Sequence, residues 1–412
     1  PNSSFTVSGS TITFSSNLVT NDVIDFIQIL GDVLDLGVPS DATVTTAKLA
    51  SDSVTYEKIG YNANQFRNII INGDMSLAQR GTSASSLTGN GYNTCDRWYS
   101  QISSTGTWTQ SQSTDVPSGQ GFATSYKWDC TTADASLAAG DSIIFQQRVE
   151  AQNLQYLKKG TANAESTTLS FWVKSNKTGT YITNLYDENN RDISKAYTIS
   201  SANTWEKKTL TFAGDTSGAF GNDNAVGLYV NFYLSAGSNL TSGTLGTTWS
   251  SYTAANTAVG QVNLADSTAN EWYVTGIQLE AGQTSSDFEF LPHDVNLQRC
   301  YRYFQHHLKR PNEAYTGGFR SATSVQVGIQ MFAEMRGNPS ATYQGIRCHD
   351  LADGNNLDAS AISFGGVGGD YRTAIWTIIT CASGGNSGDV SIIHGQDTES
   401  SGILGFYMDA EL

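Results

Sequence analysis

The alternation of apolar and polar residues along this chain predicts short β-strands joined by turns. Near the start, apolar residues alternate with polar ones from Phe5 to Phe14, around a Ser-Gly-Ser turn at residues 8–10. A period of two turns one side of a strand toward a core, and a short turn of this composition joins the strands of a hairpin. Residues 23–29 continue as an apolar strand. We therefore expect residues 1–38 to be the end of a small β-module.

Residues 66–292 show the same alternation over a much longer stretch. Short apolar segments are separated by clusters of Gly, Ser, Asn and Asp, which favour turns. Many short strands with this turn chemistry indicate a β-sandwich, and we expect a jelly-roll domain. The expected strands are 68–71, 142–148, 167–174, 181–186, 207–212, 225–234 and 271–279.

The period changes over residues 293–309, which we expect to be a helical connector. The apolar residues Leu297, Cys300, Tyr301, Phe304 and Leu308 follow helical spacing and form one face. A thin connector cannot bury such a face within one chain, so the face indicates contact with other subunits. We expect His306 and His307 on a solvated helix face. The basic cluster either complements the dipole at the helix C-terminus or contacts a neighbouring subunit's acid or a phosphorylated lipopolysaccharide core; it consists of Arg299, Arg302, Lys309 and Arg310.

Residues 310–412 return to strands and form a second predicted β-domain. Its expected strands are 325–332, 361–364, 374–380, 390–394 and 404–409. The predicted fold class is therefore all-β and multidomain, with jelly-roll or sandwich domains joined by one short helix.

A ten-residue repeat lies between the first module and the jelly roll. Residues 41–50 read DATVTTAKLA and residues 51–60 read SDSVTYEKIG, so that Val, Thr, Lys and an aliphatic residue recur at the same positions. Two copies of ten residues bury no core of their own, so such repeats stack on neighbours or on other chains. We interpret residues 39–65 as the neck of a homotrimeric fibre, against the alternative of a coincidental loop repeat.

Composition excludes several classes of partner. The formal charge is −15, and charged residues make up only 15% of the chain. Because phosphate recognition needs clustered Lys and Arg, we expect no nucleic-acid partner.

No apolar run reaches the ~18 residues of a membrane span, and we expect no membrane insertion. No signal peptide opens the sequence, and we expect the sequence to be a fragment. Five cysteines without a CxxC spacing predict neither a zinc site nor a disulfide framework.

Sugar recognition by a β-sandwich needs exposed aromatic faces together with amide or guanidinium groups that reach hydroxyls. We assign Trp98, Trp172 and Trp205 to the core, because each adjoins an apolar strand. The candidates in polar surroundings are Trp108, Trp128, Trp249 and Tyr252. In the last domain, Gly-rich loops adjoin a second set of candidates: Tyr315, Arg320, Tyr371 and Arg372, of which we rank Tyr371 and Arg372 first.

No catalytic residue, cofactor or metal is expected. Paired carboxylates hydrolyse glycans only at a suitable spatial separation, and no recognisable motif supplies such a pair. Three acidic and amide clusters have calcium-like chemistry, but Asn and Asp are also the residues that turns favour. We interpret all three as turns; they span residues 187–192, 222–224 and 350–358.

Several stretches, taken in order, resemble the tail fibres of short-tailed bacteriophages. They are FTVSGSTITFSSNLVTNDVIDFIQIL (5–30), the TVTTAKL and SVTYEKI copies of the repeat, NIIINGDMSLAQRGTS (68–83), YNTCDRWYS (92–100), LSFWVKSNKTGTY (169–181), VTGIQLEAGQTSSDFEFLPHDVNLQRCYRYF (274–304), MFAEMRGNPSATY (331–343) and DAEL (409–412). The resemblance also extends to jelly-roll carbohydrate-binding modules for residues 66–292, and to a fibre tip domain for residues 310–412.

This resemblance implies a homotrimeric adhesin that recognises a bacterial surface polysaccharide, lipopolysaccharide or capsule, for host attachment. It implies a receptor site at the tip and contact with a phage tail adaptor or nozzle through the N-terminal part. The location it implies is the virion, after synthesis in the host cytoplasm. Two alternatives stay open: a tailspike-like glycan depolymerase and a secreted carbohydrate-binding module.

Overall fold

The computed structural model describes residues 5–9, 11–17, 19–20, 23, 66–308, 313–365, 372–381, 384–395 and 405–412. The chain divides into two units, residues 1–60 and residues 61–412. In the first unit, β1 (Phe5–Ser8) and β2 (Thr11–Phe14) pair in antiparallel register, with Phe5 opposite Phe14. This confirms the predicted hairpin. The repeat, and residues 24–29 of the next expected strand, lie outside the described residues.

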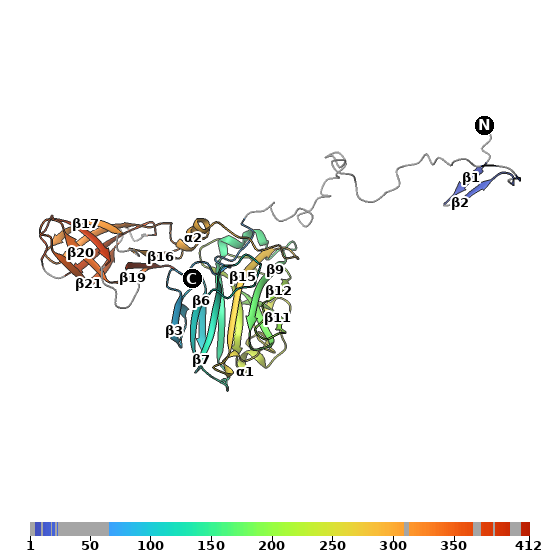
Figure 1. The fold of residues 1–412 in the computed structure, drawn as a ribbon, viewed down its shortest axis with the longest axis horizontal. Helices are drawn as coiled ribbons and strands as arrows, with labels where there is room; N and C mark the ends of the chain where they lie inside the picture. Colours follow the sequence, from blue (N-terminus) through green and yellow to red (C-terminus); the bar gives the residue numbers. More distant parts are fainter. Residues whose placement is uncertain are drawn as a thin grey trace. The chain divides into compact units, whose positions relative to one another are not determined.

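Two antiparallel sheets form a β-sandwich in the second unit. The sheets have the strand orders β14-β11-β10-β13-β8-β5-β4 and β12-β9-β15-β7-β6-β3, and Figure 1 shows the second sheet. The predicted all-β fold class with a jelly-roll sandwich is confirmed. The strands are β3 Ser83–Leu87, β4 Gly91–Tyr92, β5 Tyr99–Ser103, β6 Thr107–Ser113, β7 Ser125–Thr132, β8 Ser142–Glu150, β9 Thr167–Ser175, β10 Gly179–Asp187, β11 Arg191–Ile199, β12 Glu206–Phe212, β13 Val226–Ala236, β14 Ser250–Ser251 and β15 Glu271–Ala281. Short helical segments are η2 Ala151–Leu157, α1 Ser238–Thr241, η3 Ala254–Asn256 and η4 Leu264–Asp266.

Alternate side chains of the strands fill the space between the two sheets. Phe171 and Val173 of β9 are fully buried there, and so is Phe145 of β8. Trp98 stacks on Phe145 with ring centroids 4.5 Å apart. A strand turns every second side chain to the same face, so the period of two in the sequence becomes one continuous core. The core assignment of Trp98 is confirmed.

Trp172 and Trp205, also expected in the core, are only partly buried. Trp172 lies between two inward-facing residues of β9 and therefore points to the opposite face of its strand. The indole of Trp205 donates to Asp115 at 2.9 Å and packs edge-on against Tyr273. The core prediction is wrong for both residues, because an apolar run marks a strand without saying which of its residues face inward.

Residues 68–71 are buried but form no strand, contrary to expectation. The side chain of Gln147 provides here the main-chain hydrogen bonds that a neighbouring strand would otherwise provide. Its side chain accepts from the Ile71 main-chain N–H at 2.7 Å and donates to the Ile71 carbonyl at 2.8 Å. A buried backbone must have its hydrogen bonds satisfied, and a side-chain amide offers both partners without a ladder.

The connecting helix is shorter than the sequence pattern predicts. Helix α2 spans His293–Tyr301, and strand β16 follows at Phe304–His307. His306 and His307, expected on the helix and in solvent, are buried in this strand, which pairs with β24 (Gly405–Asp409). Phe304 and Leu308 are likewise buried within this chain. The helical prediction is wrong beyond Tyr301, and burial within the chain removes this face as an argument for other subunits.

Basic residues of this segment bind partners within the chain. Arg302 donates two hydrogen bonds of 2.7 Å to the carboxylate of Glu150, which is fully buried. Arg299 donates to the main-chain carbonyl of Asn68 at 3.2 Å. The expected partner on a neighbouring subunit or a lipopolysaccharide phosphate is therefore wrong for Arg302. Lys309 and Arg310 lie outside the described residues.

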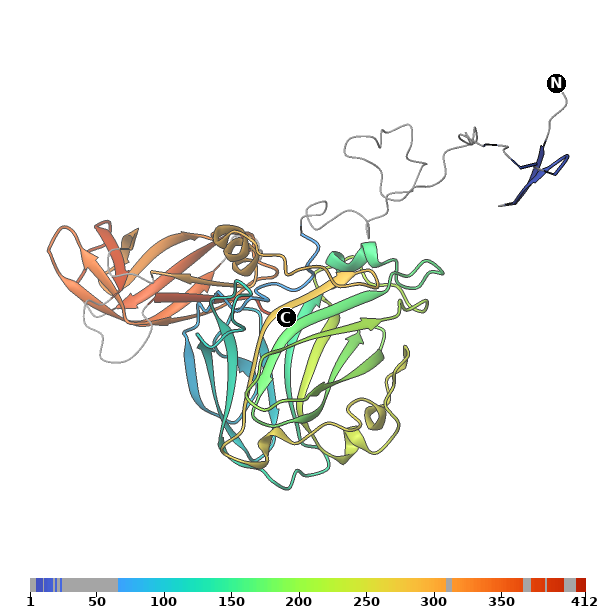
Figure 2. The same ribbon diagram turned by 45° about the vertical axis from the view of Figure 1, so that its right-hand side comes forward.

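The C-terminal strands close into a barrel with the order β17-β18-β22-β21-β20-β23, and a three-stranded sheet, β16-β24-β19, adjoins it. Strands β17, β20 and β21 are labelled in Figure 1, and Figure 2 shows the same orange-to-red strands turned by 45°. The strands are β17 Ala314–Ser321, β18 Ser324–Gln330, β19 Ser340–Gln344, β20 Ile346–Asp350, β21 Asn356–Gly365, β22 Ala374–Cys381 and β23 Val390–Gly395. Val325, Ile329, Ile379 and Ile393 are among the fully buried residues of its core.

All five cysteines are buried with free thiols. Within the described part of the chain, no helix is long and apolar enough to cross a membrane.

Candidate functional site

One face of the seven-stranded sheet carries a row of tyrosines and amides beside a few apolar side chains. On β13, Val230 and Phe232 face the core, and the residues that alternate with them, Tyr229, Asn231 and Tyr233, face the other way. Strands β10, β8 and β5 repeat this alternation. Because strand neighbours point to opposite faces, four adjacent strands place their polar and aromatic residues side by side.

Tyrosines form the aromatic part of this face. Tyr186 of β10 is directly opposite Tyr229 of β13, and their ring centroids are 5.5 Å apart. Tyr252, which follows β14, packs edge-on against Tyr186 at 5.3 Å and is 36% exposed. Burial raises the pKa of both Tyr186 and Tyr252. Both phenols are therefore neutral near pH 7, and each can donate as well as accept a hydrogen bond.

A row of amides lies beside the tyrosines. Asn184 of β10 is opposite Asn231 of β13, which is in turn opposite Gln146 of β8. Asn231 donates to Asn184 at 3.2 Å, and Asn184 donates to Asp192 and Ser194, each at 3.0 Å. These bonds fix the orientation of the amides. Among the described residues, none pairs with the Oδ1 of Asn231 or the Nε2 of Gln146, so one acceptor and one donor remain for a ligand.

Arg148 of β8 supplies a cation at the same face. Its guanidinium carbon lies 4.0 Å from the ring centroid of Tyr99 and 5.7 Å from that of Tyr229. Its Nε donates to Gln146 at 3.2 Å, and another of its nitrogens donates to the main-chain carbonyl of Leu412. Stacking on aromatic rings and these bonds hold the planar group in one orientation, which favours directional recognition of oxygen atoms.

These residues line a groove of about 630 Å³. This volume lies within the ~300–1,000 Å³ typical of ligand sites. None of the described residues that line the groove is Asp or Glu. The lining residues are Gln101, Gly140, Ser142, Ile144, Gln146, Arg148, Asn184, Tyr186, Asn190, Tyr229, Asn231, Tyr233, Asn239, Leu240 and Tyr252.

The four aromatic candidates of the jelly roll have different positions. Trp108 and Trp128 are fully buried and pack edge-on at 5.5 Å between the sheets. Trp249 packs against the same core, and its indole donates to the carbonyl of Ala213 at 2.7 Å. The prediction of exposed platforms is wrong for Trp108 and Trp128, because their polar sequence neighbours are the outward-facing half of each strand, whereas Trp249 lies outside the strands and is partly buried. Tyr252 alone of the four lines the groove.

None of the described candidates of the C-terminal domain lines the groove. Tyr315 is half-buried and its hydroxyl lies 2.6 Å from the Nδ1 of His307. Arg320 is exposed five residues further along β17, about 17 Å away at ~3.3 Å per residue. Arg372 pairs with Glu334 at 3.1 Å. Tyr371 lies outside the described residues.

Sequence reasoning missed most of the groove. Tyr186, Tyr229, Asn184, Asn231 and Arg148 lie in stretches that were correctly expected to be strands. A usable signal was present, since Tyr229, Asn231 and Tyr233 of β13 alternate with apolar residues, and Asn184 and Tyr186 of β10 flank Leu185. The sequence pattern does not specify which strands pair, and the groove forms only because β10, β13 and β8 are neighbours in one sheet.

No family model matches this chain, and no curated protein matches it. Among solved structures, the enzymatically active domain of bacteriophage CBA120 tailspike protein 4 aligns at a TM-score of 0.28 and 16% identity. That alignment covers 52% of this chain and 21% of the tailspike chain. A family 11 carbohydrate-binding module of Clostridium thermocellum, in complex with a β-1,3-1,4-mixed-linked tetrasaccharide, has a TM-score of 0.25 and 10% identity over 50% of this chain and 98% of its own. A tandem carbohydrate-binding domain from Paenibacillus barcinonensis Xyn10C also has a TM-score of 0.25 and 10% identity, over 85% of this chain and 98% of its own.

Proposed function

We propose that the groove on the seven-stranded sheet binds a carbohydrate chain without cleaving it. The observation that carries this proposal is the cross-strand row of Tyr186 and Tyr229 beside the amides of Asn184 and Asn231. Tyrosine rings offer flat apolar faces for the C–H faces of a sugar, and fixed amides offer donors and acceptors for its hydroxyls. The groove combines both on one rigid sheet.

The charge of the groove supports binding over hydrolysis. Glycoside hydrolysis uses a pair of carboxylates on the two sides of the scissile bond. The described residues that line the groove contain no carboxylate, and they contain a guanidinium, that of Arg148. A guanidinium suits the carboxylate or phosphate groups of acidic polysaccharides. The proposed ligand is therefore a bacterial surface polysaccharide with sugar faces and acidic substituents.

The proposal extends to a biological role in a phage tail fibre. What supports this role is the order of the fibre-like sequence stretches from residue 5 to residue 412. Three copies on one fibre would raise avidity through effective concentration. Light scattering of the full chain tests the trimer: three times 44.2 kDa is expected for a fibre, and 44.2 kDa for a secreted monomeric module.

The binding site is tested by single substitutions in the full chain on an array of bacterial surface polysaccharides. Tyr229→Ala and Asn231→Ala should each lower affinity about tenfold or more, as truncation of a central contact does. Tyr156→Ala is the matched control, because Tyr156 is 48% exposed and does not line the groove. Circular dichroism and melting curves confirm that each variant folds.

Two results would overturn this assignment. Binding that survives both groove substitutions but is lost in Arg372→Ala or Tyr371→Ala would place the receptor site on the C-terminal domain instead. Shortening of the polysaccharide after incubation with pure protein, measured by size-exclusion chromatography, would show a depolymerase.

A further inference from the structure

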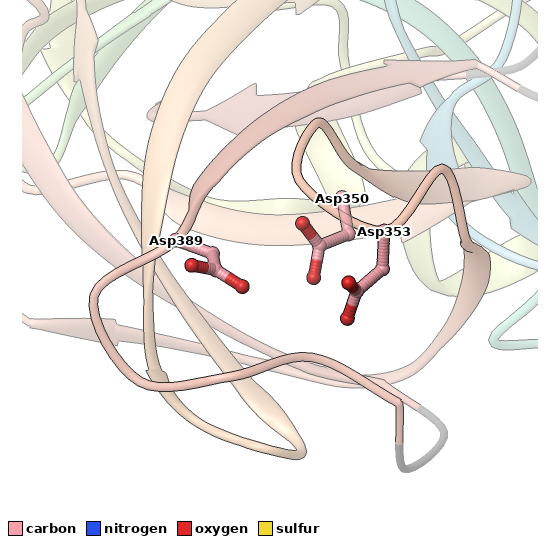
Figure 3. A group of neighbouring side chains, drawn as sticks. All are labelled: Asp350, Asp353 and Asp389. Atoms are coloured by element: carbon pink, nitrogen blue, oxygen red, sulfur yellow. The ribbon is translucent and has the colours of Figure 1, made fainter.

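Three aspartates meet at one end of the C-terminal barrel. Asp350 ends β20, Asp353 lies in the turn that follows, and Asp389 immediately precedes β23. One carboxylate oxygen from each lies within 4.8 Å of the other two, and Figure 3 shows the three carboxylates converging on a common space. Within the described residues, no Lys, Arg or His forms an ion pair with any of them. Among the described residues, no side-chain cation therefore offsets the repulsion between the three charges.

The burial of Asp350 is a second observation, independent of the clustering. Asp350 is fully buried, and its Oδ1 accepts from the Ala352 main-chain N–H at 2.9 Å. Its Oδ2 is buried and has no hydrogen-bond partner among the described residues. A buried carboxylate oxygen without a partner is costly, because it has lost its water and gained nothing in return. Such an atom indicates a positively charged ligand.

Ser391 supplies a third observation at the same place. It is fully buried, and its hydroxyl also has no partner among the described residues. Ser391 of β23 is directly opposite Asp350 of β20. Opposite residues of an antiparallel pair have their side chains on one face, with β-carbons about 5 Å apart. Two buried oxygen atoms without a partner among the described residues, the Oδ2 of Asp350 and the hydroxyl of Ser391, therefore belong to side chains on the same face of this strand pair.

From this arrangement we propose that Asp350, Asp353 and Asp389 bind a calcium ion. All available ligands are oxygens, which calcium prefers, and the cluster has no His or Cys of the kind that zinc favours. Two oxygens that bind one calcium at ~2.3–2.6 Å lie at most about 5 Å apart, which agrees with the spacing of the carboxylates. The hydroxyl of Ser391 and main-chain carbonyls are available to complete the six to eight ligands that calcium takes, about half of which the carboxylates supply.

The ion would connect two loops of the barrel. Hydrogen bonds already join them: the main-chain N–H of Leu351 donates to the carbonyl of Val390 at 3.1 Å, and the side-chain amide of Asn386 donates to the carboxylate of Asp353 at 2.9 Å. A calcium ion would add a link between the β20–β21 turn and the start of β23. The expected turn at Asp353-Gly354 is present, with a positive φ of 73° at Gly354, and calcium binding is a further role for it.

Calorimetric titration of the full chain with CaCl₂ tests the site. We expect one calcium per chain with a dissociation constant of ~10⁻⁴ to 10⁻³ M, the range of extracellular modules with few charged ligands. Asp353→Asn and Asp389→Asn should each weaken calcium binding about tenfold or more. Asp358→Asn is the matched control, because Asp358 is an exposed aspartate of the same barrel that pairs with Arg347 at 2.8 Å. It should leave calcium affinity unchanged.

Melting curves provide an independent test, because the proposal predicts the direction in which calcium shifts the melting temperature. Without calcium, Asp389→Asn removes repulsion and should melt at or above the wild-type temperature; with about 10 mM calcium it should melt below the wild type. No heat and no melting shift of the wild type at this concentration would overturn the proposal, as would wild-type affinity in both Asp353→Asn and Asp389→Asn. Glycan binding by the groove is measured in a separate experiment. The failure of one proposal therefore leaves the other proposal standing.

Discussion

The pair of Arg302 and Glu150 allows a sharp test of how the connecting helix is held. We consider Arg302→Met, which keeps the apolar stem of the side chain but removes its charge. Glu150 is fully buried and accepts two hydrogen bonds of 2.7 Å from Arg302, whereas Arg302 is 30% exposed. When the pair is broken, Glu150 therefore stays as a buried charge without this partner, whereas Arg302 can be solvated by water.

The expected magnitude follows from this asymmetry. Removal of one partner of a buried ion pair costs about 3–5 kcal/mol, because the other charge stays buried. Gln152 still donates to Glu150 at 2.5 Å, so we expect the lower end, about 3 kcal/mol, for Arg302→Met. Glu150→Gln leaves a guanidinium that water can reach, and the loss should be about 1–2 kcal/mol.

The assay is urea unfolding of the wild type, both single variants and the double variant at pH 7. The double variant should be more stable than the sum of the single effects predicts, since neither charge is left alone in it. Equal stability of Arg302→Met and wild type would refute the reasoning. So would strict additivity, because it would show that Arg302 acts on a partner other than Glu150.

The pH dependence of the same pair has a definite sign. Burial alone would raise the pKa of Glu150, but hydrogen bonds from Arg302, Tyr303 and Gln152, together with the positive charge of Arg302, outweigh burial and hold the pKa below the ordinary 4.5. A lowered folded-state pKa gives stability that is present above pH 4.5 and is lost as the pH falls through the folded value. The melting temperature of the wild type should therefore fall more steeply below this pH than that of Glu150→Gln.

Three further predictions concern the core, a backbone position and a buried histidine. Trp128→Ala should cost about 3–5 kcal/mol of stability, because Trp128 is fully buried, and a glycan array at a temperature where the variant is folded should show unchanged ligand preference. Gly276→Ala should lower the melting temperature, since φ is 63° and a β-carbon there would lie 2.5 Å from the Phe122 ring; a higher melting temperature would contradict this geometry. Burial lowers the pKa of His307 to about 4, so the unfolded chain binds more protons between that value and 6.5. Wild-type stability should therefore decline from pH 6.5 toward pH 4, and less so in His307→Gln, as melting curves across this range would show.

The sequence by itself determined the all-β class and the positions of many strands. Residues 142–148, 167–174, 207–212 and 271–279 have the period of two or the apolar run that a sandwich strand requires, and each lies within an observed strand. Local turn chemistry likewise placed the hairpin at residues 187–192. These features depend on the periodicity of a single strand, which the sequence records directly.

Only the tertiary structure decided which side of each strand became the groove. Trp128 and Tyr229 both lie on strands, yet one fills the core and the other lines the groove, because inward and outward positions depend on register and on the facing sheet. The helix beyond Tyr301 was replaced by a strand, since β24, about a hundred residues later, pairs with Phe304–His307. Asp350 and Asp389 are separated along the chain but meet at the end of the barrel. Contacts between residues so far apart arise from strand pairing, which no local pattern specifies.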